Sequence, residues 1–295
     1  MELKQPLRTL LFVPGHKQRM LEKARTASAD AIILDLEDGV PVGEKEAARA
    51  TVRRALEEGG YGPQVILRVN GFATGLTEGD LKGAFGPGVA GICLPRAEGL
   101  ADALRLAPLI TELEQIHGRE TGTVCIVGMI ETARGMLHAY EFAEGCLRVR
   151  ALCLGAEALA GDLGAVRTQA GEELAHARRQ LVLSARATAV WAIDTIWTDL
   201  NDLEGLRAEA RRARDLGCSG KLIIHHDQAV PVHEAFMPTA KEVAHARRVV
   251  EAFEAASKRG DGVIALDGYL VHASVVARAR ETLRLAGVRR SSDGI

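Results

Sequence analysis

Residues 31–39 read AIILDLEDG, a short apolar run followed at once by acidic residues and a glycine. A continuous apolar run, rather than an alternating one, is typical of a strand buried on both faces, as in a parallel sheet. Polar residues that begin where such a strand ends lie at its carboxyl end, where parallel α/β proteins build their sites. This stretch therefore predicts both a class of fold and a place for the chemistry.

The same kind of run recurs along the chain, with helical segments between. Including residues 31–34 there are eight, the others at 9–13, 65–69, 91–94, 123–130, 152–154, 192–196 and 221–224. Helices are expected over 18–29, 43–58, 100–116 and 203–216. Strands that alternate with helices predict parallel pairing with right-handed crossovers. The count and the length of 295 residues favour an α/β fold, a (β/α)8 TIM barrel of about 250 residues with an extension. An open doubly wound sheet is the alternative.

The chain divides after the eighth run. We expect the barrel to occupy residues 1–235 and a C-terminal helical extension to occupy 236–295. The extension contains a predicted helix at 239–258, a short strand at 263–266 and another helix at 274–286. It is too small for an independent domain. We therefore expect it to pack at a barrel mouth, either its own or that of a neighbouring subunit.

Composition narrows the classes of partner. Lys and Arg number 37 and Asp and Glu 39, a net charge of −2, which argues against a protein that binds nucleic acid or a membrane surface. No apolar run approaches the roughly 18 residues of a membrane span, and residues 1–6 lack the apolar stretch of a signal peptide. The five cysteines form no Cys-x-x-Cys pair, as expected of buried thiols in a reducing compartment. A cytoplasmic location is predicted.

Polar side chains follow seven of the eight predicted strands. They include His16, Glu37, Asp38, Arg68, Arg96, Glu131, Glu157, His225 and His226. A single carboxylate after a strand is often only a helix cap, but a barrel brings all these ends to one mouth. Carboxylates mixed with arginines suit a divalent ion with oxygen ligands and an anionic substrate. The adjacent residues His225 and His226 are expected to point in different directions, and no other pattern indicates zinc.

At these positions the chain resembles the citrate lyase β-subunit-like enzymes of the HpcH/HpaI aldolase group. The likeness extends over nearly the whole sequence. Its motifs are RTLLFVPG at 8–15, ILDLEDGV at 33–40, RVN at 68–70, LPR at 94–96, IET at 130–132 and GK at 220–221.

The resemblance implies a (β/α)8 barrel whose extension packs on a neighbour in a homotrimer, a hexamer or a larger assembly. It also implies a Mg²⁺-dependent lyase that splits a 3-hydroxyacyl thioester of the citryl-, malyl- or citramalyl-CoA type. The products are an acyl thioester and an oxo acid. The expected partners are thus small CoA-thioester or oxo-acid substrates, with neither nucleic acid nor membrane.

Several residues take roles from this resemblance. Arg68 is expected to bind substrate and to neutralise a thioester enolate, and Glu131 to ligate the metal beside the substrate. Glu37 and Asp38 are expected to hold metal waters and orient Arg68, and Arg8 to meet substrate or a CoA phosphate. The structural alternative for Arg68 is a buried salt bridge with Asp35 or Asp38.

Two positions depart from the family pattern. Ala158 stands where a second metal-binding Asp is usual, so Glu157 is a candidate metal ligand and Asp162 a further one. His272 stands where family members supply an acidic residue across a subunit interface. An imidazole there can move protons near neutral pH, and the alternative is an ordinary surface histidine.

Three functions are consistent with these residues. The first is an active Mg²⁺-assisted carbon–carbon lyase on a CoA-linked 3-hydroxy acid. The second is a related thioesterase, or an aldolase acting on a free hydroxy acid. The third is a noncatalytic paralogue with a weakened metal site.

Overall fold

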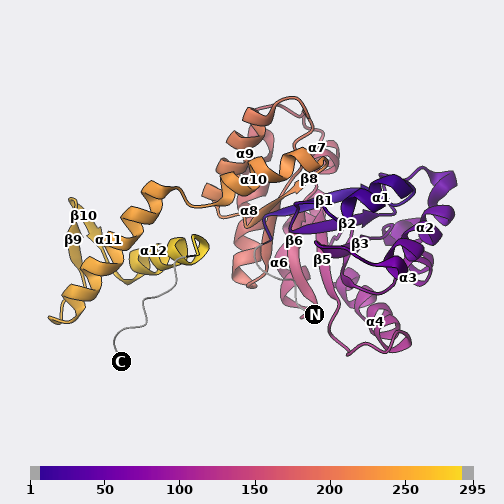
Figure 1. The fold of residues 1–295 in the computed structure, drawn as a ribbon, viewed down its shortest axis with the longest axis horizontal. Coiled ribbons are helices and arrows are strands. Elements are labelled where there is room, and N and C mark those ends of the chain that lie inside the picture. Colours follow the sequence, from indigo (N-terminus) through magenta and orange to yellow (C-terminus); the bar gives the residue numbers. More distant parts are fainter. Residues whose placement is uncertain (1–6, 288–295) are drawn as a thin grey trace. The chain divides into compact units, whose positions relative to one another are not determined.

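A closed barrel of eight parallel strands forms the larger part of the molecule (Figure 1). The structure is a computed structural model that describes residues 7–287. β1 pairs with β2 on one side and with β8 on the other, which closes the sheet. The predicted (β/α)8 barrel is thus confirmed, and the open sheet was the wrong alternative. The strands are β1 Thr9–Pro14, β2 Ala31–Asp35, β3 Gln64–Arg68, β4 Val89–Leu94, β5 Cys125–Ile130, β6 Val149–Leu154, β7 Trp191–Asp194 and β8 Gly220–Ile223.

Helices follow the strands and cover the outside of the barrel (Figure 1). The shortest are α5 Ala133–Leu137 and α6 Ala139–Glu144. The other helices and the 3-10 turns are α1 Gln18–Ala24, η1 Val42–Glu44, α2 Lys45–Glu58, η2 Phe72–Thr74, α3 Thr77–Ala84, α4 Leu100–Ile116, α7 Ala156–Leu163, η3 Glu172–Leu174, α8 Ala175–Ala187, α9 Leu203–Leu216, η4 His226–Gln228 and α10 Ala229–Phe236. The four helices expected here are present, although α1 ends five residues before the predicted Ala29.

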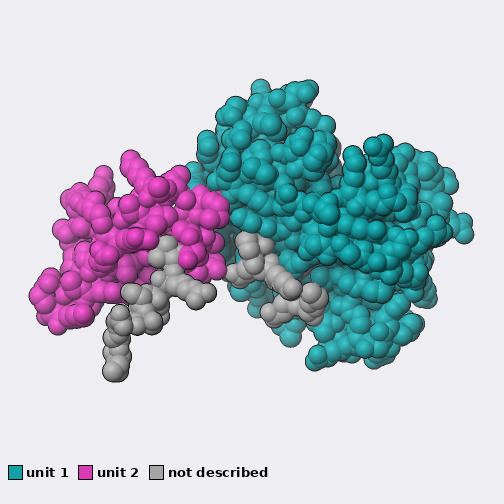
Figure 2. Space-filling view, in the orientation of Figure 1, with its two compact units in different colours: residues 1–236 teal, residues 237–295 magenta. Residues whose placement is uncertain are grey.

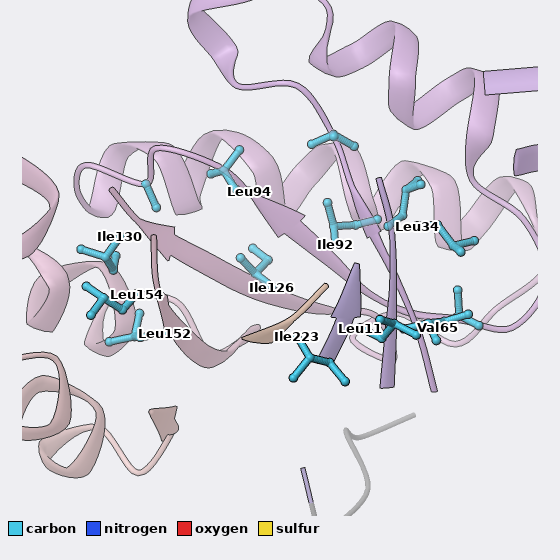
Figure 3. Packing of buried hydrophobic residues seen from close by; sticks show 14 of the residues in the cluster. Leu11, Leu34, Val65, Ile92, Leu94, Ile126, Ile130, Leu152, Leu154 and Ile223 are labelled. Carbon is cyan, nitrogen blue, oxygen red and sulfur yellow. The ribbon is translucent and has the colours of Figure 1, made fainter. Parts of the chain in front are cut away.

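Alternate residues of each strand separate into two apolar clusters. One fills the space between the strands and the helices, where Leu34, Ile92 and Ile126 lie (Figure 3). The other fills the barrel and includes Ile33 and Ile66. Strands covered on both faces explain why the sequence shows continuous apolar runs. All five cysteines are buried as free thiols, as expected.

The chain divides into two compact units, the barrel unit Met1–Phe236 and a second unit Met237–Ile295, drawn in different colours in Figure 2. The second unit contains α11 Ala240–Ser257, β9 Ile264–Leu266, β10 Tyr269–Val271 and α12 Ala273–Leu285. β9 and β10 form an antiparallel hairpin whose two-residue turn, Asp267-Gly268, has φ of 53° and 82°. Asp-Gly suits such a turn because both positions need positive φ. Packing of this unit on a barrel mouth stays a prediction.

No helix within residues 7–287 is both long enough and apolar enough to cross a bilayer.

Candidate active site

The carboxyl ends of the strands, called the mouth below, bring Asp35 and Arg68 together. The two residues end β2 and β3 and are register partners. Nε and Nη2 of Arg68 donate to the two oxygens of Asp35, each at 2.7 Å, and both side chains are buried. The salt bridge that the sequence offered as the structural alternative is therefore present. It fixes the plane of the guanidinium and leaves N–H groups for a ligand, because a guanidinium carries five.

The loop after β2 supports the Asp35 carboxylate from its backbone. The amides of Glu37 and Gly39 donate to Oδ1 and Oδ2 of Asp35, each at 2.8 Å. A Cβ on Gly39 would lie 2.4 Å from Oδ2, so the glycine of AIILDLEDG is needed for this close approach. From the sequence, Asp35 was expected only as a possible salt-bridge partner. The structure shows it to be the anchor of Arg68.

Glu37 lies on the other side of the guanidinium. Its Oε2 is 3.0 Å from Nη1 of Arg68, although the geometry is not that of a hydrogen bond. Among the described residues this buried oxygen has no hydrogen-bond partner. Burial raises the pKa of Glu37 to about 8, against the opposing charge of Arg68 and with help from the charges of Asp38 and Glu131. A desolvated carboxylate oxygen without donors favours a cation or a bound water beside it.

Phe12 supports Arg68 from within the barrel. Its ring centre lies 4.5 Å from the guanidinium carbon, a cation–π contact. Burial lowers the pKa of Arg68, but Asp35 and Glu37 outweigh it and raise that pKa above its usual value. Arg68 is therefore a permanent positive charge in a fixed plane.

Glu131 follows β5 and is buried, with 5% of its surface exposed. Its Oε2 accepts from the amide of Arg96 at 2.7 Å. Arg96 has a φ of 48°, a left-handed backbone uncommon outside glycine, and this conformation aims the amide at the carboxylate. A Cβ on Gly155 would lie 2.3 Å from Cγ of Glu131, so the end of β6 makes room for the side chain only because it is glycine.

Glu131 and Arg68 both lie at the mouth, because Arg68 ends β3 and Glu131 directly follows β5. Burial raises the pKa of Glu131, whereas the Arg96 amide and the charge of Arg68 lower it and the charge of Asp38 raises it. The charges of Asp38 and Glu131 likewise raise the pKa of Glu37. The predicted group of Glu37, Asp38, Arg68 and Glu131 is thus brought together.

The donors at this mouth fit a divalent ion with oxygen ligands. Glu131 is a buried carboxylate, Glu37 has an oxygen without a donor, and Asp38 is an exposed carboxylate within their field. Mg²⁺ in proteins takes one or two carboxylates and keeps several waters for a substrate to replace. Glu131 would hold such an ion directly, and Glu37 and Asp38 would accept hydrogen bonds from its waters.

Arg8 does not join this group. It precedes β1, and its Nε and Nη2 donate to Asp30, which precedes β2, at 3.1 and 2.9 Å. Both residues therefore lie at the amino ends of the strands, opposite the mouth. Contact of Arg8 with substrate or a CoA phosphate stays a prediction.

The two candidate second ligands lie on α7. Glu157 is exposed, and its Oε1 accepts from Nε of Arg167 at 2.9 Å. Asp162 lies one turn after Ala158, on the same face of the helix. Its Oδ2 accepts from the amide of Ala133, two residues after Glu131, at 2.7 Å. Of the two, Asp162 contacts the segment that follows Glu131, whereas Glu157 is paired with Arg167.

His272 belongs to the second unit. It precedes α12, and its side chain is exposed and makes no capping hydrogen bond to that helix. Its predicted catalytic role therefore stays a prediction.

Comparisons with known proteins identify related families and structures. Residues 8–226 match the family model described as HpcH/HpaI aldolase/citrate lyase. The citrate lyase subunit beta of Leuconostoc mesenteroides subsp. cremoris is 37% identical over 287 residues, 97% of this chain and 95% of that protein. A (3S)-malyl-CoA thioesterase of Cereibacter sphaeroides is 36% identical over 288 residues, 95% of each chain.

A solved structure is also similar to this chain. CitE from Mycobacterium tuberculosis, in complex with magnesium, acetoacetate and coenzyme A, aligns with a TM-score of 0.80 and 32% identity, over 96% of this chain and 99% of that one. Its fold thus matches over both units of the chain. On these grounds the chain belongs to the HpcH/HpaI aldolase/citrate lyase family, a lyase-type enzyme family to which citrate lyase beta subunits belong.

Proposed function

We propose that this protein is a Mg²⁺-assisted carbon–carbon lyase that cleaves a 3-hydroxyacyl-CoA thioester into an acyl-CoA and an oxo acid. The observation that carries the proposal is that Arg68 and Glu131, a fixed cation and an oxygen donor, are both buried at the carboxyl ends of the strands. Relatives named citrate lyase subunit beta, and a neighbour holding magnesium, acetoacetate and coenzyme A, support it.

Cleavage of the carbon–carbon bond requires the site to handle a proton and a developing negative charge. The hydroxyl proton leaves, the carbon–carbon bond breaks as that carbon becomes a carbonyl, and the released electron pair delocalises onto the thioester oxygen as an enolate. A proton then returns to carbon to give the acyl thioester. A divalent ion at Glu131 would polarise the hydroxy-acid oxygens. Arg68 stabilises the enolate charge, because its guanidinium is already oriented before the charge develops.

The anchoring contacts explain why Arg68 suits this task. Two oxygens of Asp35 fix its edge and Phe12 covers its face, so it needs no reorganisation when the substrate binds. The mouth holds more carboxylates than arginines, so a divalent cation would balance the charge when an anionic acid enters. This makes binding of metal and oxo acid mutually favourable.

Product analysis tests the proposal. Pure protein with Mg²⁺ is incubated with malyl-, citramalyl- and citryl-CoA, and acetyl-CoA and the oxo acid are followed together. We expect both to appear in equal amounts with at least one substrate. If no substrate turns over, and oxaloacetate with Mg²⁺ causes no thermal shift, the lyase proposal is overturned in favour of a noncatalytic role.

Thioester hydrolysis is the second candidate, because a malyl-CoA thioesterase is 36% identical over 95% of the chain. The same assay separates the two reactions. Hydrolysis releases free CoA and the hydroxy acid, with no oxo acid.

A further inference from the structure

The turn that follows β8 carries His225, His226 and Asp227 at the carboxyl end of that strand. The two imidazole rings lie side by side, with centres 4.2 Å apart and planes tilted by 40°. The expectation that these neighbours diverge was therefore wrong, because the 3-10 turn η4 tightens the backbone just after His225. One ligand atom from each of the three residues lies within 4.8 Å of the others.

This turn is held in place by a buried side chain, not only by its own backbone. Gln228 is 1% exposed, and its Oε1 accepts from the amides of Ile224 and His225 at 2.9 and 3.3 Å. Its Nε2 donates to the carbonyl of Trp197 at 2.9 Å. The three side chains therefore project from a backbone that is fixed before any ligand binds, which lowers the entropy cost of binding.

The distances around Asp227 suit a shared ion better than direct contact. Nδ1 of His225 is 3.4 Å from Oδ2 of Asp227, and Nε2 of His226 is 3.4 Å from Oδ1. Both exceed the roughly 2.7–3.2 Å of an N–H···O hydrogen bond. Two ligands in a tetrahedral site with bonds of about 2.1 Å are themselves about 3.4 Å apart. A weak bond from the Asp227 amide to Nδ1 of His225, at 3.3 Å, would give way to the ion.

We propose that His225, His226 and Asp227 bind a divalent transition-metal ion of the Zn²⁺ class. Two imidazole nitrogens and one carboxylate are a ligand set typical of zinc, whereas Mg²⁺ prefers oxygen alone. The site is therefore chemically distinct from the oxygen donors around Glu131. The side chains of His226 and Asp227 are 64% and 67% exposed, so the remaining coordination positions face solvent and stay open to water or another ligand.

Calorimetric titration with Zn²⁺, in excess Mg²⁺ to fill the oxygen-ligand group, tests this site. We expect one equivalent to bind, and Co²⁺ in its place to give the visible absorption of a four- or five-coordinate ion. His226→Ala and Asp227→Asn should each weaken binding about tenfold or more. His225 is kept, because it caps the turn. The matched control is His176→Ala, an exposed histidine on α8, which should bind as the wild type does.

Three results would overturn the proposal. The first is a wild-type protein that takes up no stoichiometric Zn²⁺, and the second is unchanged Zn²⁺ binding by the variants of His226 and Asp227. The third is loss of the Zn²⁺ site in Glu131→Gln, since this would assign the ion to the group around Glu131 instead. The melting temperature of each metal-free variant shows that it is folded, so weaker binding cannot be mistaken for unfolding.

Discussion

Arg68 is held by two carboxylates and an aromatic ring, and its replacement tests the mechanism at the scale of one residue. Arg68→Ala should abolish cleavage. Arg68→Lys should lower kcat by about 10²- to 10³-fold, because an ammonium lacks the planar fork. Breaking the buried pair with Asp35 should also cost about 3 kcal/mol of unfolding free energy.

Steady-state kinetics and thermal unfolding of these variants make the check. Arg186→Ala, an exposed arginine of α8 that donates to the Gly217 carbonyl, is the control and should keep full activity. An unchanged cleavage rate in folded Arg68→Ala would remove Arg68 from the chemistry.

Gly155 makes room for Glu131, which gives a second test at this scale. In Gly155→Ala the new Cβ would lie 2.3 Å from Cγ of Glu131, so the carboxylate has to move. We expect the thermal shift produced by Mg²⁺ with oxaloacetate to be lost or strongly reduced. Gly161→Ala is the control, because its Cβ meets nothing within 4 Å and should stabilise α7 by up to about 1 kcal/mol. Equal shifts in the two variants would contradict this placement of Glu131.

What the sequence could predict of the site follows from where each group sits on its strand. Glu37, Arg68 and Glu131 were identified because they follow apolar runs, and strand ends converge in a barrel. The amide of Arg96 could not be identified, because its role depends on a left-handed backbone and not on its side chain. Arg8 precedes its strand, so strand direction alone places it at the opposite end.

Among the elements, α7 carries Ala158, the position at which the family resemblance implies a second metal-binding residue. Ala158 lies one turn before Asp162, whose carboxylate reaches the amide of Ala133. Ala158→Asp should therefore add a carboxylate on the face directed to the Glu131 segment and tighten Mg²⁺ binding, measured by titration without substrate. Leu163→Asp, on another face of α7 and 48% exposed, adds the same charge and should leave the affinity unchanged. Equal effects of the two substitutions on Mg²⁺ affinity would show that the change comes from net charge alone.

The amino ends of β1 and β2 are joined to α10 by a charged contact. Asp30 accepts from Arg8, and Nε2 of His233 lies 3.3 Å away. Burial opposes ionisation of Asp30, but His233 and Arg8 outweigh it and hold the pKa well below its ordinary 3.8. A carboxylate with a lowered folded pKa stabilises the protein above its ordinary pKa and loses that contribution as the pH falls below it.

Asp30→Asn should therefore destabilise the protein by about 1–3 kcal/mol near pH 7. The difference in unfolding free energy between the variant and the wild type should narrow as the pH falls below about 4. Urea unfolding across that range makes the measurement. Asp215→Asn, which breaks an exposed pair with Arg214, should cost under about 1 kcal/mol. A gap that stays constant with pH would show that Asp30 contributes no ionic stabilisation.

Some elements were not predicted because tertiary packing overrides the secondary-structure preference of the local sequence. α3 contains Gly79 and Gly83, which weaken the helical signal. Both lie against Arg49, and a Cβ on either would come within about 3.2 Å of that side chain. β10 was not predicted, because pairing with β9 defines Tyr269–Val271 as a strand.

At the scale of the whole molecule, the barrel could be predicted from the sequence because every strand is covered on both faces. The function of the second unit could not be predicted, because its composition does not indicate which barrel it packs against. Within that unit the hairpin and the residue before it expose Val263, Tyr269 and Leu270, at 53%, 77% and 66%. Large apolar side chains exposed together are typical of a surface that another protein covers.

Mixed oligomers test whether that surface completes a neighbour's site, as the family resemblance implies. Arg68→Ala and His272→Ala should each lose most activity alone. If one subunit supplies His272 to the barrel of the next, coexpression of the two variants assembles sites that carry neither change, about a quarter of the total for random mixing. Activity should then return to about a quarter of wild type. If mixed oligomers form, as mass measurement of differently tagged subunits would show, and no activity returns, then His272 does not act across the interface.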